Sequence, residues 1–285
     1  HNHPAAHPLI RGIRRVLDSY PGERVMVGEV NLGSAALLAP YYGDGDELHM
    51  VFDFSLLHAP WDASRWGELI AESEAALTPT GAWPVWVLSN HDTPRHRSRH
   101  GGSEARARVA ALVLLTLRGT PFLYAGEELG LLDAEIPPEA VVDPGGRDGC
   151  RAPIPWDGKP GHGWAGEPWL PWPPEAETRN AAAQAGDPRS ILNLYRRLLA
   201  LRRATPALHG GAWRRLDAPA GVLAYERGEP GGAGARRVGA NFGEEDAAWP
   251  SEGWTVDLTT DGRGEGGRWA GRLAGTSAVV LRPPG

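Results

Sequence analysis

Two acidic side chains follow apolar stretches of the kind that form buried strands. Glu29 lies near the end of RVMVGEV, and Asp92 follows WPVWVLSN, with Asn90 and His91 just before it. The carboxyl ends of parallel strands share one edge of a sheet, where α/β enzymes build active sites. Two carboxylates there suit glycoside chemistry, because one protonates the leaving oxygen while the other meets positive charge at the sugar. Asn90 and His91 could then hold sugar hydroxyls.

These residue types also have plain structural interpretations. A solvated loop carboxylate would account for Glu29, and Asn90-His91-Asp92 could form an Asx turn without a function. Many α/β enzymes place acids at strand ends for other reactions. The single cysteine, Cys150, has no His or Asp at a spacing that would activate its thiol, so we do not expect a cysteine nucleophile.

Elements that would position the two acids alternate between strand and helix. Apolar runs predict strands over 24–30, 48–57, 83–90 and 120–130. Helical spacing of apolar residues, with capping and stop signals, predicts helices over 8–20, 62–77, 103–119 and 187–208. Asp62 or Ser64, Ser103 and Asp187 are the expected N-caps. The alternation favours an α/β fold with a parallel sheet covered by helices.

From about residue 209 the pattern changes to short apolar runs between Gly, Pro and Asp turns. The runs at 221–227, 236–242, 254–260 and 277–283 predict an antiparallel β domain. We therefore expect a first domain over 1–208, with a long Pro/Gly/Trp-rich loop at 131–186, and a second domain over 209–285. The boundary is expected between Leu208 and Gly211.

Composition excludes several other classes of protein. The net charge of −6 gives no reason to expect a nucleic-acid partner. The longest apolar run, Val109 to Leu117, is far shorter than the roughly 20 residues that a membrane-spanning helix needs. One cysteine fits a reducing compartment but would also suit a lightly built secreted enzyme; of the two, we expect a cytoplasmic protein. His3 and His7 would suggest a metal pair on a helix, but Pro4 and Pro8 disfavour helix there, and we expect no metal site.

Four motifs, in this order, resemble the α-amylase superfamily, glycoside hydrolase family 13. They are VGEV at 27–30, LSNHDTPR at 88–95, RGTPFLYAGEELG at 118–130 and GRDGCRAPIPWD at 146–157. They are most similar to the α-glucosidase and oligo-1,6-glucosidase branch, and the resemblance covers almost the whole chain. It implies a (β/α)8 TIM barrel followed by an antiparallel β-sandwich, with this chain supplying strands five to eight and the sandwich.

The resemblance also implies roles for the site residues. Glu29 matches the general acid/base, Asp92 matches the transition-state stabiliser that distorts the bound sugar, and His91 matches the residue that hydrogen-bonds hydroxyls in the −1 subsite. An arginine of the RDGxR motif helps to close the −1 pocket, and Arg147 and Arg151 both fit, with Arg147 preferred. Both arginines could instead only brace the Pro-rich loop.

A nucleophile is not found by the same comparison. The family's nucleophile is an Asp in an R-x-D motif after strand four, but Asp18 is expected within a helix and Asp53 within a strand, and neither has Arg two residues before it. We therefore expect the chain to correspond to the C-terminal half of the barrel and to be inactive without the N-terminal half as its partner.

The expected function is that of a retaining α-glucosidase. It would hydrolyse α-1,4 or α-1,6 bonds at the non-reducing end of short oligosaccharides such as maltose or isomaltose, without a cofactor. Two alternatives remain open: a glucosyltransferase or isomerase of the trehalose synthase or sucrose isomerase type, and a non-catalytic relative of α-glucosidases.

Overall fold

The computed structural model describes residues 2–284. Its α-helices are α1 (Ala6–Asp18), α2 (Ala35–Leu38), α3 (Ser55–His58), α4 (Ala63–Leu77), α5 (His96–Arg99), α6 (Glu104–Thr116), α7 (Ala181–Gly186), α8 (Ile191–Ala204) and α9 (Pro206–His209). Short 3-10 helices are η1 (Ala39–Tyr42), η2 (Thr78–Thr80), η3 (Pro138–Ala140) and η4 (Asp148–Arg151). The strands are β1 (Val27–Gly28), β2 (Met50–Asp53), β3 (Pro84–Val87), β4 (Thr120–Phe122), β5 (Trp213–Arg215), β6 (Val222–Arg227), β7 (Arg236–Asn241), β8 (Ala247–Ala248), β9 (Thr255–Thr259), β10 (Arg272–Leu273) and β11 (Ala278–Arg282).

The first half of the chain forms a parallel sheet in the order β1-β2-β3-β4. Every neighbouring pair is parallel, and Val51 pairs with Pro84 while Val85 pairs with Thr120. Helix α4 connects β2 to β3, and α6 connects β3 to β4. Each return therefore crosses the sheet through a helix, so all four strands end at the same edge. The predicted α/β architecture of this part is confirmed.

Local signals account for where the connecting helices begin. The Asp62 side chain accepts a hydrogen bond from the Arg65 N–H at the start of α4, and the Ser103 hydroxyl accepts one from the Arg106 N–H at the start of α6. Each cap satisfies one of the unpaired donors of the first turn. Asp62, rather than Ser64, is the cap of α4.

The carboxyl end of α6 is closed by two buried arginines. Arg202 of α8 donates to the carbonyls of Leu115 and Leu117, and Arg227 of β6 donates to the carbonyl of Thr116. Cationic side chains suit the partial negative charge of a helix carboxyl end. These contacts fix the turn from α6 into β4, the last strand of the parallel sheet.

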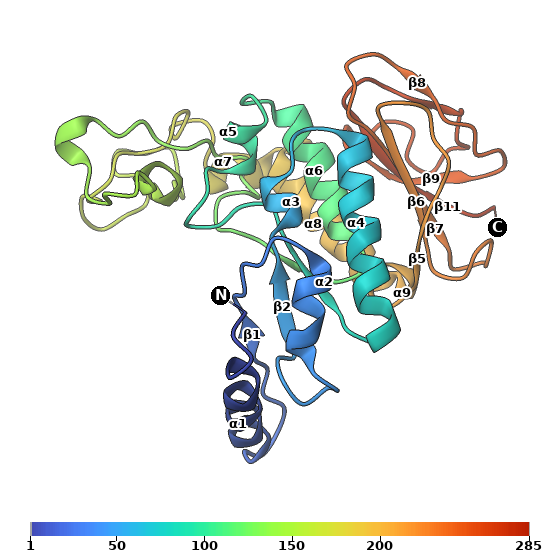
Figure 1. Cartoon of the computed structure of the whole chain (residues 1–285). Helices are drawn as coiled ribbons and strands as arrows, with labels where there is room; N and C mark the ends of the chain where they lie inside the picture. The colour runs from blue at the N-terminus through green and yellow to red at the C-terminus, as the bar shows by residue number, and fades with distance from the viewer. Residues whose placement is uncertain (1, 285) are drawn as a thin grey trace.

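The second half contains a five-stranded antiparallel sheet in the order β5-β6-β7-β11-β9 and a two-stranded sheet of β8 and β10. The larger sheet packs against α4 and α6 (Figure 1). One buried cluster joins the two parts, with Leu112 and Leu194 from the helices and Tyr225, Val238 and Val280 from the sheet. The two predicted regions therefore share a hydrophobic core.

Several predicted bounds were wrong. The strands of the parallel sheet are two to four residues long, and the rest of each predicted apolar run lies in the loops or helices beside the strand. Helix α8 is capped by Ser190 rather than Asp187. Pro8 lies within the first turn of α1, where no intrahelical N–H is required, so it did not exclude a helix.

Helix α1 projects from the rest of the molecule (Figure 1). Its attachment is polar, since Glu47 is bonded by His7 and by Arg11, at 2.7 and 2.8 Å. The apolar face expected from the sequence is exposed: Leu9, Ile13 and Val16 are 70%, 53% and 58% exposed. No residue of α1 is fully buried, although Ile10 on another side of the helix is partly buried against the cluster that contains Tyr41 and Leu48.

No helix in residues 2–284 has the length and apolar character needed to cross a bilayer.

Candidate active site

Glu29 lies directly after β1 and lines a cavity of about 200 Å³ at the carboxyl edge of the parallel sheet. Asn90 and His91, which follow β3, line the same cavity, as do Phe52 and Tyr124 from the ends of β2 and β4. Parallel strands bring their carboxyl ends together, so residues from distant parts of the sequence meet here. The structure thus brings together three of the predicted site residues.

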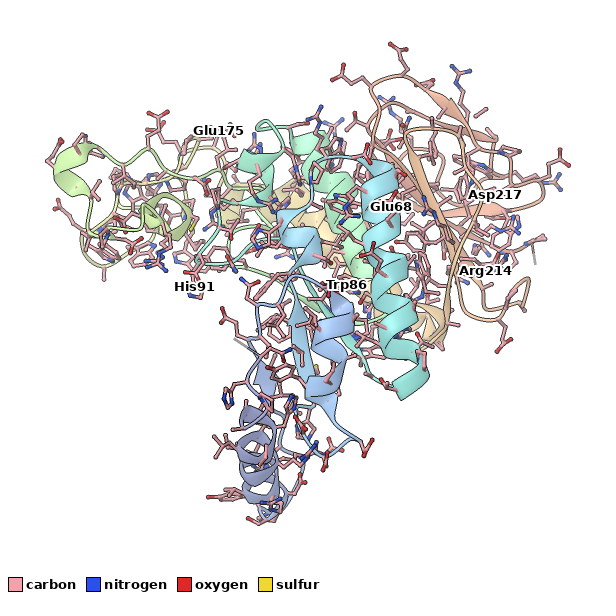
Figure 2. The ribbon with its side chains drawn as sticks, in the orientation of Figure 1. Glu68, Trp86, His91, Glu175, Arg214 and Asp217 are labelled. Atoms are coloured by element: carbon pink, nitrogen blue, oxygen red, sulfur yellow. The ribbon has the colours of Figure 1, made fainter. Side chains whose placement is uncertain are left out.

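The end of β3 changes abruptly from buried to exposed. Trp86 is fully buried, whereas the His91 side chain is 62% exposed (Figure 2). The Asn90 side chain accepts a hydrogen bond from the Asp92 N–H at 3.0 Å, which is the Asx turn considered as an alternative. The Asx turn does not exclude a functional site at these residues, because the same hydrogen bond holds the backbone that carries Asp92.

Asp92 points to the long loop rather than to Glu29. Its Oδ1 accepts a hydrogen bond from Arg147 Nη1 at 2.6 Å and lies 3.4 Å from Arg151 Nη2. Arg151 Nε also donates to the His91 carbonyl at 2.8 Å. Both arginines of the RDGxR motif therefore hold the Asn90-His91-Asp92 turn from outside the sheet.

A third acid, Asp143, completes the cluster and was not predicted. Arg147 donates to it from Nε at 2.8 Å and from Nη2 at 2.7 Å, in a bidentate pair. The available signal was the sequence DPGGR at 143–147, which is typical of a tight turn that returns an arginine to the acid starting it. The Gly146 N–H donates to the Asp143 carbonyl, as such a turn requires.

These contacts shift the pKa values of the cluster in opposite directions. Hydrogen bonds from Arg147 hold the pKa of Asp143 well below its usual range. Hydrogen bonds to Asp143, and then to Asp92, raise the pKa of Arg147. Arg147 is therefore permanently cationic, and Asp143 stays ionised wherever the protein is folded at neutral pH.

The segment that carries the arginines is tied to the sheet by buried groups. Asp148 Oδ2 accepts hydrogen bonds from the N–H groups of Val142 and Asp143, both at 2.8 Å. The Tyr124 hydroxyl, from the end of β4, donates to the Cys150 carbonyl at 3.2 Å. Cys150 is buried, and burial raises the pKa of its thiol, which disfavours the nucleophilic thiolate.

Asp92 and Glu29 line separate cavities. The cavity beside Asp92 has a volume of about 550 Å³ and is lined by Asp133, Arg147, Asp148 and Cys150 among others, without Glu29. Neither of these two cavities is lined by both acids, although His91 Nε2 lies only 3.6 Å from Asp92 Oδ2. The turn at Asn90 separates them: Asn90 and His91 face one cavity, and Asp92 faces the other.

Sequence reasoning also missed a buried carboxyl below the site. Glu127, from the GEELG motif, accepts hydrogen bonds from the Tyr195 hydroxyl at 3.1 Å and the Tyr124 N–H at 3.3 Å. Burial raises the pKa of Glu127 to about 8. It supports the segment that carries Tyr124 and does not line either cavity.

Metal-binding side chains do not gather in the described part of the chain. No group of three or more His, Cys, Asp or Glu within residues 2–284 is placed to hold a metal ion. His7, one of the two histidines near the start, bonds Glu47 instead.

The chain is similar in sequence and in structure to known proteins. The family model described as "Alpha amylase, catalytic domain" matches residues 1–211. A probable alpha-glucosidase of Rhizobium meliloti (strain 1021) is 36% identical over 244 residues, which cover 79% of this chain and 44% of that protein. The chain thus spans about half the length of the curated relatives it matches.

Solved structures share the fold. The alpha-glucosyl transfer enzyme XgtA aligns with a TM-score of 0.85 and 34% identity, covering 98% of this chain and 54% of that one. The trehalulose synthase MutB from Pseudomonas mesoacidophila MX-45 aligns with a TM-score of 0.86 and 26% identity, covering 98% and 59%. Both the parallel sheet and the antiparallel sheet are included in these alignments.

Proposed function

The chain belongs to the α-amylase family, and from this membership we propose that it carries the acid/base part of a retaining α-glucosidase site. The observation that carries the proposal is the shared cavity at the carboxyl edge of the sheet, where Glu29 lies with Asn90 and His91. Glu29 is the proposed general acid/base. His91 and Asn90 are the proposed ligands of sugar hydroxyls, and the substrate is a short α-linked glucoside such as maltose or isomaltose.

Asp92 is proposed to stabilise the positive charge that develops on the sugar. Its present partners, Arg147 and Arg151, neutralise it, so the carboxylate must turn from them toward the Glu29 cavity to act on a sugar. A carboxylate stabilises the positive charge that develops on the sugar only when it lies beside the sugar ring, which Glu29 as the acid/base must also approach. We propose that Arg147 remains beside the sugar as the residue closing the pocket.

We further propose that residues 2–284 contain no nucleophile for this reaction and that the chain is inactive alone. In the described part, Glu29 is the only carboxylate lining its cavity. Asp18 lies at the end of α1 and pairs with Arg14, and Asp53 lies on β2 with its side chain bonded to the Ser55 N–H. A retaining hydrolase needs a second carboxylate there to form the covalent intermediate.

The missing group is proposed to come from further strands of a (β/α)8 barrel. Within residues 2–284, β1 and β4 each pair on one side only, so both edges of the parallel sheet have free backbone groups. We propose that an N-terminal half of the barrel pairs with both edges, places the nucleophile opposite Glu29 and covers α1.

An activity assay tests the proposed inactivity. The 285-residue chain is incubated with maltose, isomaltose and p-nitrophenyl α-glucoside, beside its Glu29→Gln variant. We expect no turnover from either protein. Hydrolysis by the chain that is lost in Glu29→Gln would overturn the proposal, because it would require a nucleophile within this chain.

The acid/base assignment is tested in a longer form of the protein that hydrolyses p-nitrophenyl α-glucoside. Glu29→Gln should suppress hydrolysis of maltose by about 10²–10⁴-fold and affect the p-nitrophenyl substrate less, because nitrophenolate leaves without a proton. The control is Glu23→Gln, an exposed glutamate that precedes β1. The comparison uses kcat/KM, which reports on the step that releases the leaving group; an equal loss of kcat/KM for both substrates, or no loss for maltose, would contradict the role of Glu29.

A glucosyl-transfer reaction is the second candidate, and the solved relatives favour it. One of them is named an alpha-glucosyl transfer enzyme and another a trehalulose synthase. Both reactions would use the same acid/base and differ in whether water or a sugar accepts the glucosyl group. Product analysis by NMR distinguishes them: glucose alone from maltose indicates hydrolysis, and a new disaccharide indicates transfer.

A further inference from the structure

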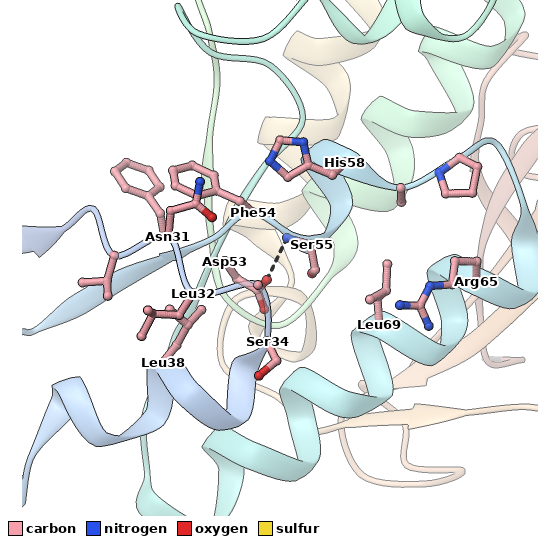
Figure 3. Close-up of a pocket in the computed structure, with 15 residues that line it drawn as sticks. Asn31, Leu32, Ser34, Leu38, Asp53, Phe54, Ser55, His58, Arg65 and Leu69 are labelled. Carbon is pink, nitrogen blue, oxygen red and sulfur yellow. Dashed lines mark hydrogen bonds between the residues drawn. The ribbon is translucent and has the colours of Figure 1, made fainter. Parts of the chain in front are cut away.

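A third cavity, separate from those lined by Glu29 and Asp92, lies on the other face of the parallel sheet. Its volume is about 250 Å³, and it is enclosed by the loop after β1, the end of β2, helix α3 and the first turns of α4 (Figure 3). Residues around it include Asn31, Asp53, Ser55, His58, Arg65 and Leu69. Glu29 and Asp92 do not line it.

Alternation along β2 explains why this cavity is separate from the candidate active site. Successive side chains of a strand point to opposite faces. Phe52 stacks on Phe54 and meets Phe122 edge-on, on the face of the Glu29 cavity. Val51 and Asp53 therefore face the helices, and Val51 is buried in the cluster beside α2. Phe52 and Phe54 form the wall between the two cavities, since they line both.

Two buried polar groups at the inner end of the cavity lack hydrogen-bond partners among the described residues. Asp53 is only 3% exposed; its Oδ1 accepts a hydrogen bond from the Ser55 N–H at 3.0 Å, but its Oδ2 has no hydrogen-bond partner among the described residues. The Ser55 hydroxyl is likewise buried without a partner there. An unpaired buried polar group is costly, and more so when it is charged. A ligand that donates hydrogen bonds to Asp53 would recover this free energy.

The opposite side of the cavity offers donors. Arg65 points toward the space from α4, while its Nη1 pairs with Glu68 of the same helix at 3.2 Å (Figure 3). The exposed side chains of Asn31 and His58 stand at the mouth. A ligand here must donate to Asp53 and accept from Arg65. A hydroxyl group does both, whereas a simple cation or anion satisfies only one side.

Apolar side chains supply the remaining walls. Leu32, Leu38 and Leu69 lie around the space with Phe54 (Figure 3). Such walls suit the C–H surface of a sugar ring, which is apolar between its hydroxyl groups. The volume is below the roughly 300 Å³ at which drug-sized ligands begin, so it accommodates one ring rather than an oligosaccharide.

We propose that this cavity binds a neutral, monosaccharide-sized polyol, held by Asp53 and Ser55 on one side and Arg65 on the other. The site is distinct from the Glu29 cavity and does not depend on the reaction proposed above. Because the loop after β1 contributes both Glu29 and Asn31, a ligand in the third cavity contacts the segment that carries the proposed acid/base.

Glucose is the probe for the test, and two histidines report on the two cavities. His58 lines the third cavity and His91 lines the Glu29 cavity. Imidazole NMR signals, assigned from His58→Gln and His91→Gln, are followed during titration of the chain up to about 100 mM glucose. We expect saturable movement of the His58 signals, and the same movement in Glu29→Gln.

Two variants decide the proposal. Asp53→Asn removes the charged acceptor, and Leu69→Phe adds a ring to the wall; each should weaken glucose binding at least about tenfold. Circular dichroism confirms that each variant is folded, and Asp53→Asn decides alone if Leu69→Phe is not. The proposal would be overturned if the His58 signals do not move, if only the His91 signals move, or if both folded variants bind glucose with unchanged affinity.

Discussion

Arg147 Nη1 lies 2.6 Å from Asp92 Oδ1 and so joins the long loop to the end of β3. The two residues are 55 positions apart in the sequence. The same guanidinium holds Asp143 at 2.7 Å. The direction of Asp92 and the position of the loop are therefore coupled, and a sugar that attracts Asp92 must also rearrange the contacts of Arg147.

Removal of the Arg147 side chain should release the segment 141–151. In Arg147→Ala, Asp143 and Asp92 lose their cationic partner, and the exchange of the Val142, Asp143 and Arg147 amides should accelerate at least about tenfold. Hydrogen exchange measured by mass spectrometry checks this. The control is Lys159→Ala, which changes an exposed residue of the same loop. Equal amide exchange rates in the two variants would contradict the coupling between Arg147 and the segment 141–151.

Glu127 should make stability fall as the pH rises. Burial raises the pKa of Glu127 to about 8, whereas the ordinary value is 4.5. Between these values the folded chain retains a proton that the unfolded chain has lost. Its contribution is complete below about pH 4.5 and is lost as the pH rises toward 8, with a slope of up to about 1.4 kcal/mol per pH unit.

Urea unfolding at several pH values measures this slope. Glu127→Gln keeps the shape of the protonated carboxyl and should flatten the free energy of unfolding over this range. Glu139→Gln changes an exposed glutamate that does not contribute to the Glu127 pKa and should keep the slope of the unaltered chain. A slope that survives in Glu127→Gln would show that another group is responsible.

Tyr225 should stabilise both halves of the molecule at once. It is fully buried in β6, and its hydroxyl lies 2.5 Å from Thr116 Oγ1 at the end of α6. Tyr225→Ala should lower the free energy of unfolding by about 3–5 kcal/mol in a single transition, because the core is shared. Tyr20→Ala, an exposed tyrosine, should change it by less than about 0.5 kcal/mol.

Tryptophan fluorescence and far-UV circular dichroism follow that transition. Two separate transitions in Tyr225→Ala, with one midpoint unchanged, would mean that the regions 1–208 and 209–285 unfold independently. That result would favour the domain boundary predicted near Leu208 over the shared core.

Exposed apolar residues on α1 should make the chain self-associate. Contiguous exposed apolar surface of this kind marks an interaction face or an aggregation site. The double variant Ile13→Glu/Val16→Glu should reduce dye binding by anilinonaphthalene sulfonate and lower the mass measured by light scattering, with helix content unchanged. Arg15→Glu adds negative charge to the same helix without removing apolar surface, so an equal effect there would assign the association to charge.

The sequence by itself determined the features that depend on neighbours in the chain. Periodic apolar residues predicted α4 and α6, single side chains predicted their caps, and apolar runs predicted four strands that end beside Glu29 and Asp92. Helical periodicity and capping involve residues a few positions apart, so they can be recognised in the sequence without the tertiary structure. The strand alternation then required a parallel sheet with both acids at one edge.

Only the tertiary structure decided which groups meet across long separations. Three features depend on how the loop 131–186 and the helices pack: the pairing of Arg147 with Asp92, the division of the acids between two cavities, and the Asp53 Oδ2 that has no hydrogen-bond partner among the described residues. The exposed face of α1 is a further example, because its periodicity is the same whether the face is buried or not. Burial and ionic contacts depend on how the whole chain packs. The spacing of residues in the sequence does not show which distant residue becomes the partner of a given side chain.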